Sequence, residues 1–455
     1  MTEISPALAH MRPPNKAADL GVPRAMVEDL FLRRLLIERM ATVHEISLAL
    51  CIRASVGREI SEELRDKQLL EYHGLEGRDY RCGLTEMGSR MALERMQQTT
   101  YADSIPVSLA DYTAVVNRQR AAMIVNRETI RAAFSDLVVE DAMLDQLGPA
   151  FMNDGAIFLY GPPGTGKTSL AERMIRIHQD LVFIPHTVTH DGAIITVYDP
   201  AIHKAATDQP VDLDPRWVAC ERPLVMVGGE MDIRMLELEY DQTSGVYTAP
   251  IQMLANNGIL VVDDFGRQAF RPDELLNRWI MPLARGIDFL KIGSGAKLTV
   301  PFELKLVAST NLDPNSLGDD AFLRRLRNKV FVGPISENAF NWILVRMAKA
   351  KGIEVNADDA SYLRNIAISN IGELRPYLVA DFCDLMEGVC AYEQVPKRLD
   401  KEMIDRVADV YFVNAAKGEA TSARKETSAN NHEIPAEPIA DPQASPQMVA
   451  AVHQP

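Results

Sequence analysis

The sequence has few cysteines, and they lack the spacing of a disulfide framework or a zinc site. Its five cysteines are scattered along the chain, and none forms a C-x-x-C pair. Closely spaced thiols are what structural zinc sites and redox motifs use, so both classes are disfavoured. Isolated thiols are typical of a reducing compartment, and we expect a cytoplasmic protein. The cysteines are Cys51, Cys82, Cys220, Cys383 and Cys390.

Long apolar runs and an excess of positive charge are also missing. No apolar stretch approaches the roughly 18 residues of a membrane-spanning helix, and no signal-peptide pattern opens the chain, so we expect no integral membrane segment. The chain carries 48 Lys and Arg against 63 Asp and Glu, a formal charge of −15. Polyanion binding depends on a basic face, so this balance argues against nucleic acid as the main partner.

A glycine-rich loop between a strand and a helix is the strongest signal present. Ala-Ile-Phe-Leu-Tyr leads into residues 161–168, which match G-x-x-x-x-G-K-[ST], and a helical pattern follows. Such a loop presents backbone N–H groups and a helix N-terminus to phosphates. Lys167 is expected to reach the β- and γ-phosphates of ATP, and Thr168 to bind Mg²⁺. The predicted nucleotide-binding residues are Gly161, Pro162, Pro163, Gly164, Thr165, Gly166, Lys167, Thr168 and Ser169.

Two later strands end in polar residues suited to phosphate chemistry. Gly-Ile-Leu-Val-Val runs into Asp263 and Asp264, and Leu-Lys-Leu-Val-Ala-Ser-Thr runs into Asn311. We expect Asp263 to complete the Mg²⁺ site and Asp264 to polarise the attacking water. Asn311 would hold that water and sense the γ-phosphate. A chance glycine-rich turn is the alternative for the loop, but the surrounding strand and helix favour ATP binding and hydrolysis.

A cationic segment follows Asn311. Residues 319–329 read Asp-Asp-Ala-Phe-Leu-Arg-Arg-Leu-Arg-Asn-Lys, and we expect Arg324 and Arg325 to act on a phosphate as an arginine finger. The alternative is a solvated basic helix face. The position of the pair after an Asn-tipped strand favours the functional interpretation.

Together these motifs resemble the AAA+ ATPases in identity, order and spacing over residues 126–415. The resemblance implies an α/β P-loop NTPase core with a parallel sheet and a C-terminal helical lid. By this resemblance the glycine-rich loop is Walker A and the strand that leads into the two aspartates is Walker B. Asn311 is sensor 1, and the Arg324–Arg325 pair is the arginine finger. Gly-Glu-Leu-Arg-Pro-Tyr-Leu from residue 372 resembles the start of the lid helix that carries sensor 2, with Arg375 as its candidate and Arg364 as a rival. The resemblance also implies a ring, most often a hexamer, in which the finger serves a neighbouring subunit.

Residues 288–303 predict a β-hairpin before Asn311, which resembles the pre-sensor-1 β-hairpin superclade that includes the MoxR-like ATPases. The whole chain resembles a bacterial group of chaperone-like AAA+ ATPases associated with Flp (Tad) pilus assembly. This implies a protein complex, such as pilus or secretion machinery, as the partner. One departure stands out, because the family usually ends Walker B with Asp-Glu. Asp264 is one methylene shorter, which predicts slow hydrolysis and leaves a non-hydrolysing nucleotide switch open.

Residues 25–97 predict three helices, a hairpin and a closing helix, an order that resembles a winged-helix domain. Its third helix is net acidic, which favours protein docking over DNA binding; plain structural packing is a further alternative. The stretch Gly-Val-Tyr-Thr-Ala-Pro at 245–250 is similar to the GAFTGA loop of enhancer-binding activators, but lies too near the Asp pair. Two alternatives to a remodelling ATPase therefore stay open, a transcription activator and a DNA-bound regulator that uses ATP as a switch.

The expected organisation has six parts. They are a loose leader at 1–24, the winged-helix-like domain at 25–97, a connector and helix at 98–150, the nucleotide-binding core at 151–334, the lid at 335–415 and a disordered tail at 416–455. The connector region is expected to contain one amphipathic helix over 127–148. Further strands are expected near 181–184 and 193–198, a hairpin over 235–250 and lid helices over 340–351 and 374–393. The histidines at 186, 190 and 203 match no metal template and are expected on the surface or in loops.

Overall fold

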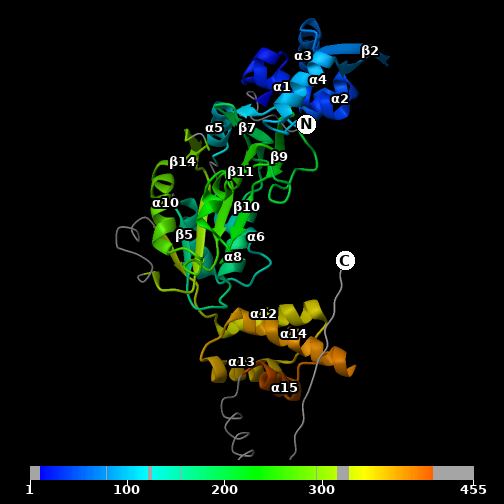
Figure 1. The fold of residues 1–455 in the computed structure, drawn as a ribbon. Helices are drawn as coiled ribbons and strands as arrows, with labels where there is room; N and C mark the ends of the chain where they lie inside the picture. The colour runs from blue at the N-terminus through cyan, green and yellow to red at the C-terminus, as the bar shows by residue number, and fades with distance from the viewer. Residues whose placement is uncertain are drawn as a thin grey trace, which may run out of the picture.

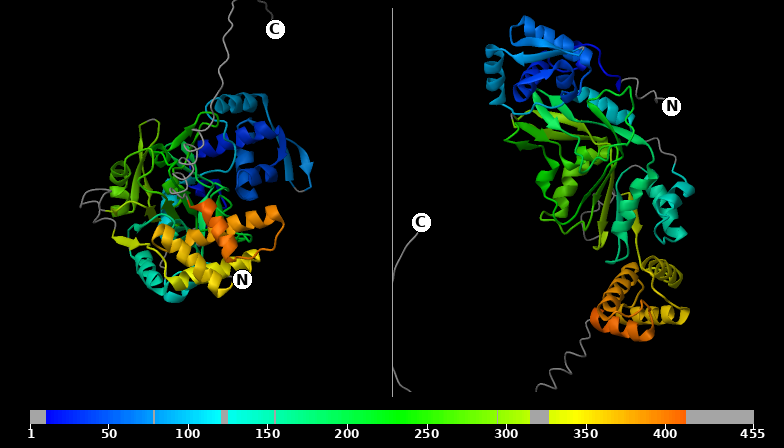
Figure 2. Two further views of the ribbon diagram at one scale, coloured as in Figure 1. Left: turned by 90° about the horizontal axis from the view of Figure 1, so that it is seen from below. Right: turned by 90° about the vertical axis from the view of Figure 1, so that its right-hand side faces the viewer.

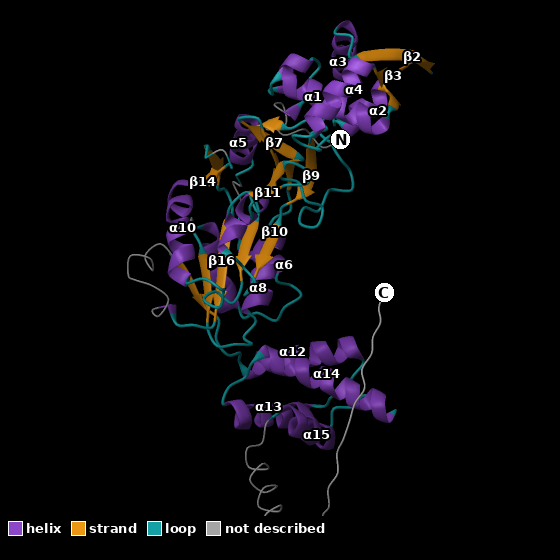
Figure 3. Ribbon diagram, viewed as in Figure 1, coloured by secondary structure: helices purple, strands orange, loops and turns teal. Residues whose placement is uncertain are grey.

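The structure is a computed structural model that describes residues 11–77, 79–120, 125–153, 155–293, 295–314 and 327–412. These residues form three bodies in a row, with an N-terminal unit and a C-terminal helical body at opposite ends of a central α/β core (Figure 1). The right-hand view of Figure 2 shows the same order from another side, and the left-hand view looks along the row from below. Strands occur in the N-terminal unit and the core, whereas the C-terminal body is helical (Figure 3). Within the described ranges, no helix is long and apolar enough to cross a membrane.

A five-stranded parallel sheet forms the centre of the core. Its order is β10-β13-β16-β5-β17, and every neighbouring pair is parallel. Parallel strands present their carboxyl ends at one edge, so the loops that follow them meet there. The strands are β5 (Ile157–Tyr160), β10 (Leu224–Val227), β13 (Ile259–Val262), β16 (Lys305–Thr310) and β17 (Asn328–Phe331).

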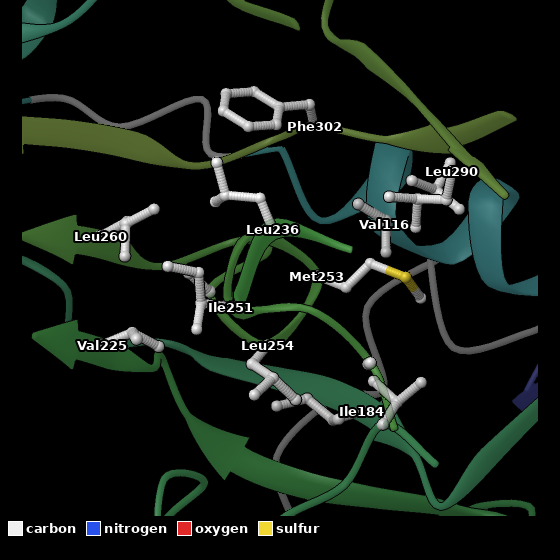
Figure 4. Close-up of a cluster of buried hydrophobic side chains, with 14 of the residues drawn as sticks. Val116, Ile184, Val225, Leu236, Ile251, Met253, Leu254, Leu260, Leu290 and Phe302 are labelled. Carbon is white, nitrogen blue, oxygen red and sulfur yellow. The ribbon is translucent and has the colours of Figure 1, made fainter. Parts of the chain in front are cut away.

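Both faces of this sheet are buried, as the continuous apolar strands require. Alternate residues of β5 point to opposite faces, so Ile157 and Leu159 join one hydrophobic cluster while Phe158 joins the other. On the Phe158 side, α9 (Ile251–Leu254) inserts Met253 and Leu254 among residues of the sheet and the hairpins. Figure 4 shows this cluster, with Val225 and Leu260 on neighbouring strands beside the α9 side chains. The layers thereby fix the position of β13, the strand that leads into Asp263.

A second sheet is built from four strands that lie between β5 and β13 in the chain and from β4 of the connector, which precedes β5. Its order is β11-β12-β8-β7-β4, and β6 pairs with β9 in a separate antiparallel ribbon. The strands expected near 181–184 and 193–198 exist as β6 and β8, but they lie outside the central sheet, whose β10 the sequence did not indicate. The hairpin expected over 235–250 is confirmed as β11 and β12. The bounds are β4 (Val107–Ser108), β6 (Leu181–Pro185), β7 (Thr187–His190), β8 (Ala193–Thr196), β9 (Trp217–Glu221), β11 (Glu239–Asp241) and β12 (Val246–Thr248).

The hairpin expected before Asn311 is also confirmed. Strands β14 (Ile287–Lys291) and β15 (Lys297–Pro301) pair antiparallel, following α10 (Pro272–Arg285). The Tyr247 hydroxyl on β12 accepts a hydrogen bond from Gly293 N–H at 2.8 Å, so the two hairpins are tied together near the turn of the second one.

The prediction of one continuous helix over 127–148 is wrong. It is divided into α6 (Arg127–Ala133) and α7 (Asp141–Met152) by a turn. Asp136 in that turn binds Arg176 at 2.7 Å on the 3₁₀ segment η3 (Met174–Ile177), which follows α8 (Lys167–Arg173). This ion pair and the β-branched valines at 138 and 139 favour leaving the helical conformation. The connector likewise contains more order than expected, because it supplies β4 and α5 (Leu109–Arg118).

In the N-terminal unit, the predicted helices, hairpin and closing helix are present, and a three-stranded sheet has the order β1-β3-β2. The expectation of a loose leader is wrong for residues 11–24. Met11, Ala17 and Leu20 are buried, and Ala17 N–H donates to Glu59 Oε2 at 3.0 Å. Residues 1–10 lie outside the described ranges. The elements are η2 (Ala17–Leu20), α1 (Arg24–Glu38), β1 (Met40–Thr42), α2 (Val43–Ala49), α3 (Ala54–Asp66), β2 (Leu70–Glu76), β3 (Asp79–Leu84) and α4 (Glu86–Met96).

A buried ion pair joins this unit to the core. Arg216 and Asp214 lie 2.7 Å apart, with side chains only 6% and 5% exposed. Arg216 Nη1 donates to Leu20 O at 2.7 Å, and Asp214 N–H donates to Met11 O at 2.8 Å. A buried charge is tolerated only when it is paired and hydrogen-bonded, so these contacts hold the N-terminal segment against the core.

Four helices form the C-terminal body around their own hydrophobic cluster. They are α12 (Glu337–Lys351), α13 (Ala357–Ile371), α14 (Pro376–Glu393) and α15 (Lys401–Tyr411). Both helices predicted here are confirmed, and α13 and α15 are additions. Polar caps define the boundaries, since Ser336 Oγ accepts from Ala339 N–H at 3.2 Å and α12 ends at Gly352 with φ 67°.

Candidate nucleotide site

The predicted phosphate loop connects β5 to α8 at the carboxyl edge of the central sheet. Gly161 has φ 147°, and a Cβ there would lie 2.2 Å from Val332 O. Gly164 has φ 75°, and its Cβ would lie 2.1 Å from the Tyr377 ring. The loop therefore needs glycine both for its backbone and for the close approach of its neighbours.

Lys167 begins α8 and turns its ammonium group back over the loop. Its Nζ donates to Gly161 O at 3.0 Å, Pro162 O at 2.8 Å and Asn311 Oδ1 at 2.7 Å. Three acceptors match the three donors of an ammonium group. Burial lowers the pKa of Lys167, while the Asp263 and Asp264 carboxylates act in the opposite direction. A phosphate would provide strong acceptors in place of the loop carbonyls.

The two carboxylates follow β13 and face polar groups from α8 and β16. Thr168 Oγ1 donates to Asp263 Oδ2 at 2.8 Å, and Ser309 Oγ also donates to Asp263. Asn311 Nδ2 donates to Asp264 Oδ1 at 3.2 Å. Asn311 thus contacts both Lys167 and Asp264, so the loop lysine, the second Asp and the strand-end Asn lie within one hydrogen-bonded group.

The C-terminal body contacts the loop at the start of α14. Arg375 precedes that helix, donates from Nη1 to Pro163 O at 3.1 Å and pairs with Glu373 at 2.5 Å. Its rival, Arg364, instead pairs with Glu337 at 3.3 Å across α13 and α12. The structure therefore brings Arg375 to the predicted site and leaves Arg364 within the helical body.

Some predicted residues lie elsewhere or outside the described ranges. Arg324 and Arg325, with the tail at 416–455, lie outside them. Of the histidines expected on the surface or in loops, His203 lies in a loop between β8 and β9, but it is buried there, with 1% of its surface exposed. Its Nδ1 accepts from Asp199 N–H at 2.9 Å and its Nε2 lies 2.8 Å from Leu254 O, so it serves as a neutral structural bridge. Burial lowers its pKa, as expected for an imidazole held neutral.

Three contributors near the site escaped the sequence reasoning. Ser309 lies two residues before Asn311 and so on the same face of β16, a signal that was available. Tyr377 reaches the loop from α14 only through tertiary packing. Gln268 lies in the turn after the two aspartates, but it belongs to no motif that marks it as part of the site.

The strand order and the loop define the class. The strand of the phosphate loop lies between β17 and the Asn311 strand, and the Asp263 strand lies beyond the latter. With the phosphate loop, the strand-end carboxylates and the C-terminal helical body, this is the α/β P-loop fold of the AAA+ ATPases.

Comparison with known proteins gives the following matches. Residues 336–410, the C-terminal helices, match a family described as a domain of unknown function, DUF8689. No curated protein sequence matches the chain. Among solved structures, the Thermotoga maritima RuvB Holliday junction branch migration motor is 14% identical, covers 68% of this chain and 80% of that chain, and has a TM-score of 0.37. NtrX from Brucella abortus in complex with ADP is 14% identical, covers 75% of this chain and 71% of that chain, and has a TM-score of 0.39. Because both TM-scores lie below 0.5, these matches carry no argument, and the fold is assigned from the strand order and the loop of this chain.

Proposed function

We propose that this chain binds ATP with Mg²⁺, hydrolyses the nucleotide and uses the energy to remodel a protein complex. The observation that carries the proposal is the convergence of Lys167, Asp264 and Asn311 in one hydrogen-bonded group beside a glycine-rich loop. Each group has a complementary task in phosphoryl transfer, and the sheet supplies them from three different strand ends.

The residues present fit a magnesium ion. Thr168 Oγ1 and Asp263 Oδ2 lie 2.8 Å apart, close to the separation of neighbouring vertices in an octahedron with metal–oxygen bonds of about 2.1 Å. Thr168 and Asp263 would therefore hold the ion, with Ser309 orienting the Asp263 carboxylate. When bound, Mg²⁺ neutralises charge on the β- and γ-phosphates.

The remaining steps belong to the side chains of this protein. Lys167 binds phosphate oxygens by exchanging its loop carbonyls for them. Asp264 accepts a proton from the attacking water, and Asn311 orients that water and the Asp264 carboxylate. Arg375, already at the loop, carries charge toward the nucleotide when the C-terminal helices move. Asp264 reaches less far than a glutamate, which supports slow turnover.

A ring, most simply a hexamer, would complete the site with Arg324 and Arg325 of a neighbouring subunit. The test is ATP hydrolysis per protomer over rising protein concentration, with the double variant Arg324→Ala/Arg325→Ala alongside. Specific activity that rises with concentration and is lost in the variant, while ATP binding remains, supports the ring. Flat activity that ignores both arginines would refute it and favour a nucleotide switch.

We infer that the N-terminal unit is a winged-helix-like adaptor for protein, for example in pilus or secretion machinery. The third helix, α3, supports this choice, because two of its carboxylates, Glu59 and Glu63, already have partners within the chain. Arg24 lies 2.5 Å from Glu63, and Ala17 N–H binds Glu59. An acidic face whose other carboxylates, Glu62 and Asp66, are exposed is poorly suited to duplex phosphates. Salt-sensitive duplex binding by the full chain would argue for the DNA-bound regulator instead.

The contacts of residues 245–250 weigh against a transcription activator. Ser244 O accepts from Thr100 N–H at 3.0 Å, and a Cβ on Gly245 would lie 2.7 Å from Gln98 O. The connector thus covers the turn that an activator would need to present to a polymerase. ATP-dependent promoter opening by the purified protein would overturn this conclusion.

A further inference from the structure

Gln268 occupies the turn that carries the two carboxylates away from β13. Its Oε1 accepts from Gly266 N–H at 2.9 Å. Its Nε2 lies 3.1 Å from Asp263 O, 3.3 Å from Asp264 O and 3.2 Å from Gly228 O. One carboxamide therefore closes the turn on itself and also joins it to the loop after β10, the neighbouring strand.

The backbone of this turn needs such support. Asp264 has φ 49°, in the left-handed region, where a residue other than glycine is held at a cost of roughly 1–3 kcal/mol. The flanking strands anchor the turn on both sides, since Asp263 N–H donates to Val227 O and Phe265 N–H donates to Ser309 O, each at 2.7 Å. Gln268 adds contacts to the carbonyls of both aspartates themselves.

The shortness of Asp264 makes backbone placement decisive. An aspartate carboxylate is separated from its backbone by only two torsions, so it has little freedom to compensate for a displaced main chain. A residue that fixes the backbone of Asp263 and Asp264 consequently fixes where their oxygens lie. An error of about 1 Å in such placement reduces turnover by roughly 100-fold.

We propose that Gln268 is a positioning residue for this site, holding the carboxylates of Asp263 and Asp264 in register with Thr168 and Asn311. The role rests on the proposed ATP hydrolysis. Gln268 has no contact with residues 161–168 among the described hydrogen bonds, so the role concerns turnover and Mg²⁺ engagement more than nucleotide affinity.

The test compares Gln268→Met with Gln268→Glu in the full chain. Methionine keeps the length but removes both hydrogen-bonding functions, and glutamate keeps an acceptor but places a carboxylate against three carbonyls. We expect kcat to fall roughly 10- to 100-fold in both. The dissociation constant for ATP measured without Mg²⁺ should stay within about twofold, because the loop contacts are untouched. The Mg²⁺ concentration that half-saturates the ATP complex should rise severalfold.

Gln209 offers a matched control in the core. Its Nε2 donates to Ala206 O at 3.0 Å and Ala219 O at 2.9 Å, and its Oε1 accepts from Ala219 N–H at 2.9 Å. Gln209→Met removes the same kinds of contact, and its kcat and Mg²⁺ dependence should equal those of the wild type.

Three results would overturn the positioning role. They are wild-type kcat in a folded Gln268→Met chain, an equal loss in Gln209→Met, or a joint collapse of kcat, nucleotide affinity and melting temperature in both Gln268 variants. Failure of the proposed hydrolysis is distinct, since the wild-type chain would then bind ATP without turning it over. In that case an unchanged Mg²⁺ dependence in Gln268→Met would still refute the positioning role.

Discussion

At the scale of single residues, the proposed function makes Asp264 the group that separates ATP hydrolysis from ATP binding. Asp264→Asn removes the proton acceptor but retains the side-chain shape, and Asn tolerates the left-handed backbone at φ 49°. We expect kcat to fall roughly 100- to 10,000-fold while ATP affinity is retained, because Lys167 and Thr168 remain in place. Steady-state hydrolysis and equilibrium binding measure the two effects.

The matched control is Asp191→Asn. Asp191 also has a left-handed backbone, with φ 48°, and its side chain is 70% exposed in the turn between β7 and β8. Its replacement should change neither quantity. If the Asp264→Asn variant still hydrolysed ATP, the proton acceptor would have to be another group.

The residues of the site were predictable where a local pattern encodes them. Lys167 and Thr168 follow from the glycine-rich loop, and Asp263, Asp264 and Asn311 follow from the ends of apolar strands. Gln268 was not predictable, because its carboxamide meets Gly228 only after two strands separated along the chain become neighbours. Met11 and Leu20 were misjudged for the same reason, since their burial depends on partners far away in sequence.

At the scale of elements, the start of α14 links the C-terminal helices to the phosphate loop. Arg375→Ala removes the guanidinium that donates to Pro163 O, and charged hydrogen bonds contribute about 1.5–3 kcal/mol. We expect ATP affinity to weaken roughly 10-fold, measured by calorimetric titration. Arg364→Ala is the control, because Arg364 pairs with Glu337 inside the helical body and should leave affinity unchanged. The reverse result would transfer the role to Arg364.

His178 lies between η3 and β6, and its burial predicts that acid destabilises this part of the fold. Burial, with a further contribution from Arg222, lowers the pKa of His178 to about 4, and its ring lies 5.6 Å from that of Phe151. The folded protein therefore prefers the neutral imidazole, whereas the unfolded chain binds a proton near pH 6.5. The contribution of His178 to the free energy of unfolding is fully present above about pH 6.5. It falls by roughly 3 kcal/mol as the pH drops toward 4.

Urea unfolding at several pH values measures this loss. His178→Phe should remove that part of the acid dependence, whereas His44→Gln, at an exposed position of α2, should retain it. An unchanged pH profile in His178→Phe would assign the acid sensitivity to other groups. His186 and His203 are candidates, because burial lowers the pKa of each.

The elements themselves were predicted with uneven success, and the failures have physical causes. The hairpins β11–β12 and β14–β15 follow from alternation around glycine turns, which is a local signal. The short β10 was missed because several other apolar runs lie between the phosphate loop and β13, and only tertiary pairing selects one of them. The break between α6 and α7 depends on the Asp136–Arg176 ion pair, which no helical periodicity reveals.

At the scale of the whole molecule, the Asp214–Arg216 pair determines how the N-terminal unit is held. Arg216→Ala leaves a buried carboxylate and loses the bond to Leu20 O, so we expect a loss of about 3–5 kcal/mol in the free energy of unfolding. Thermal denaturation measures the loss, and limited proteolysis should show faster cleavage near residues 11–24.

Arg234→Ala provides the control with the same Asp-x-Arg spacing. Arg234 pairs with Asp232 at 2.6 Å, but its side chain is 87% exposed. Exposed pairs contribute little, so the melting temperature should not change measurably. Equal effects of the two substitutions would show that the N-terminal unit is held by something other than the buried pair.

Strand β4 has a practical consequence for anyone who shortens the protein. It comes from the connector, yet it pairs with β7 and forms the outer edge of the inserted sheet. A core fragment that starts after Ser108 would bare the β7 edge, with its Thr-Val-Thr sequence open to pairing with other molecules. Such a fragment would tend to aggregate, whereas one that starts before Val107 would retain its own edge cover. A stable shortened protein should therefore begin within the connector, before β4.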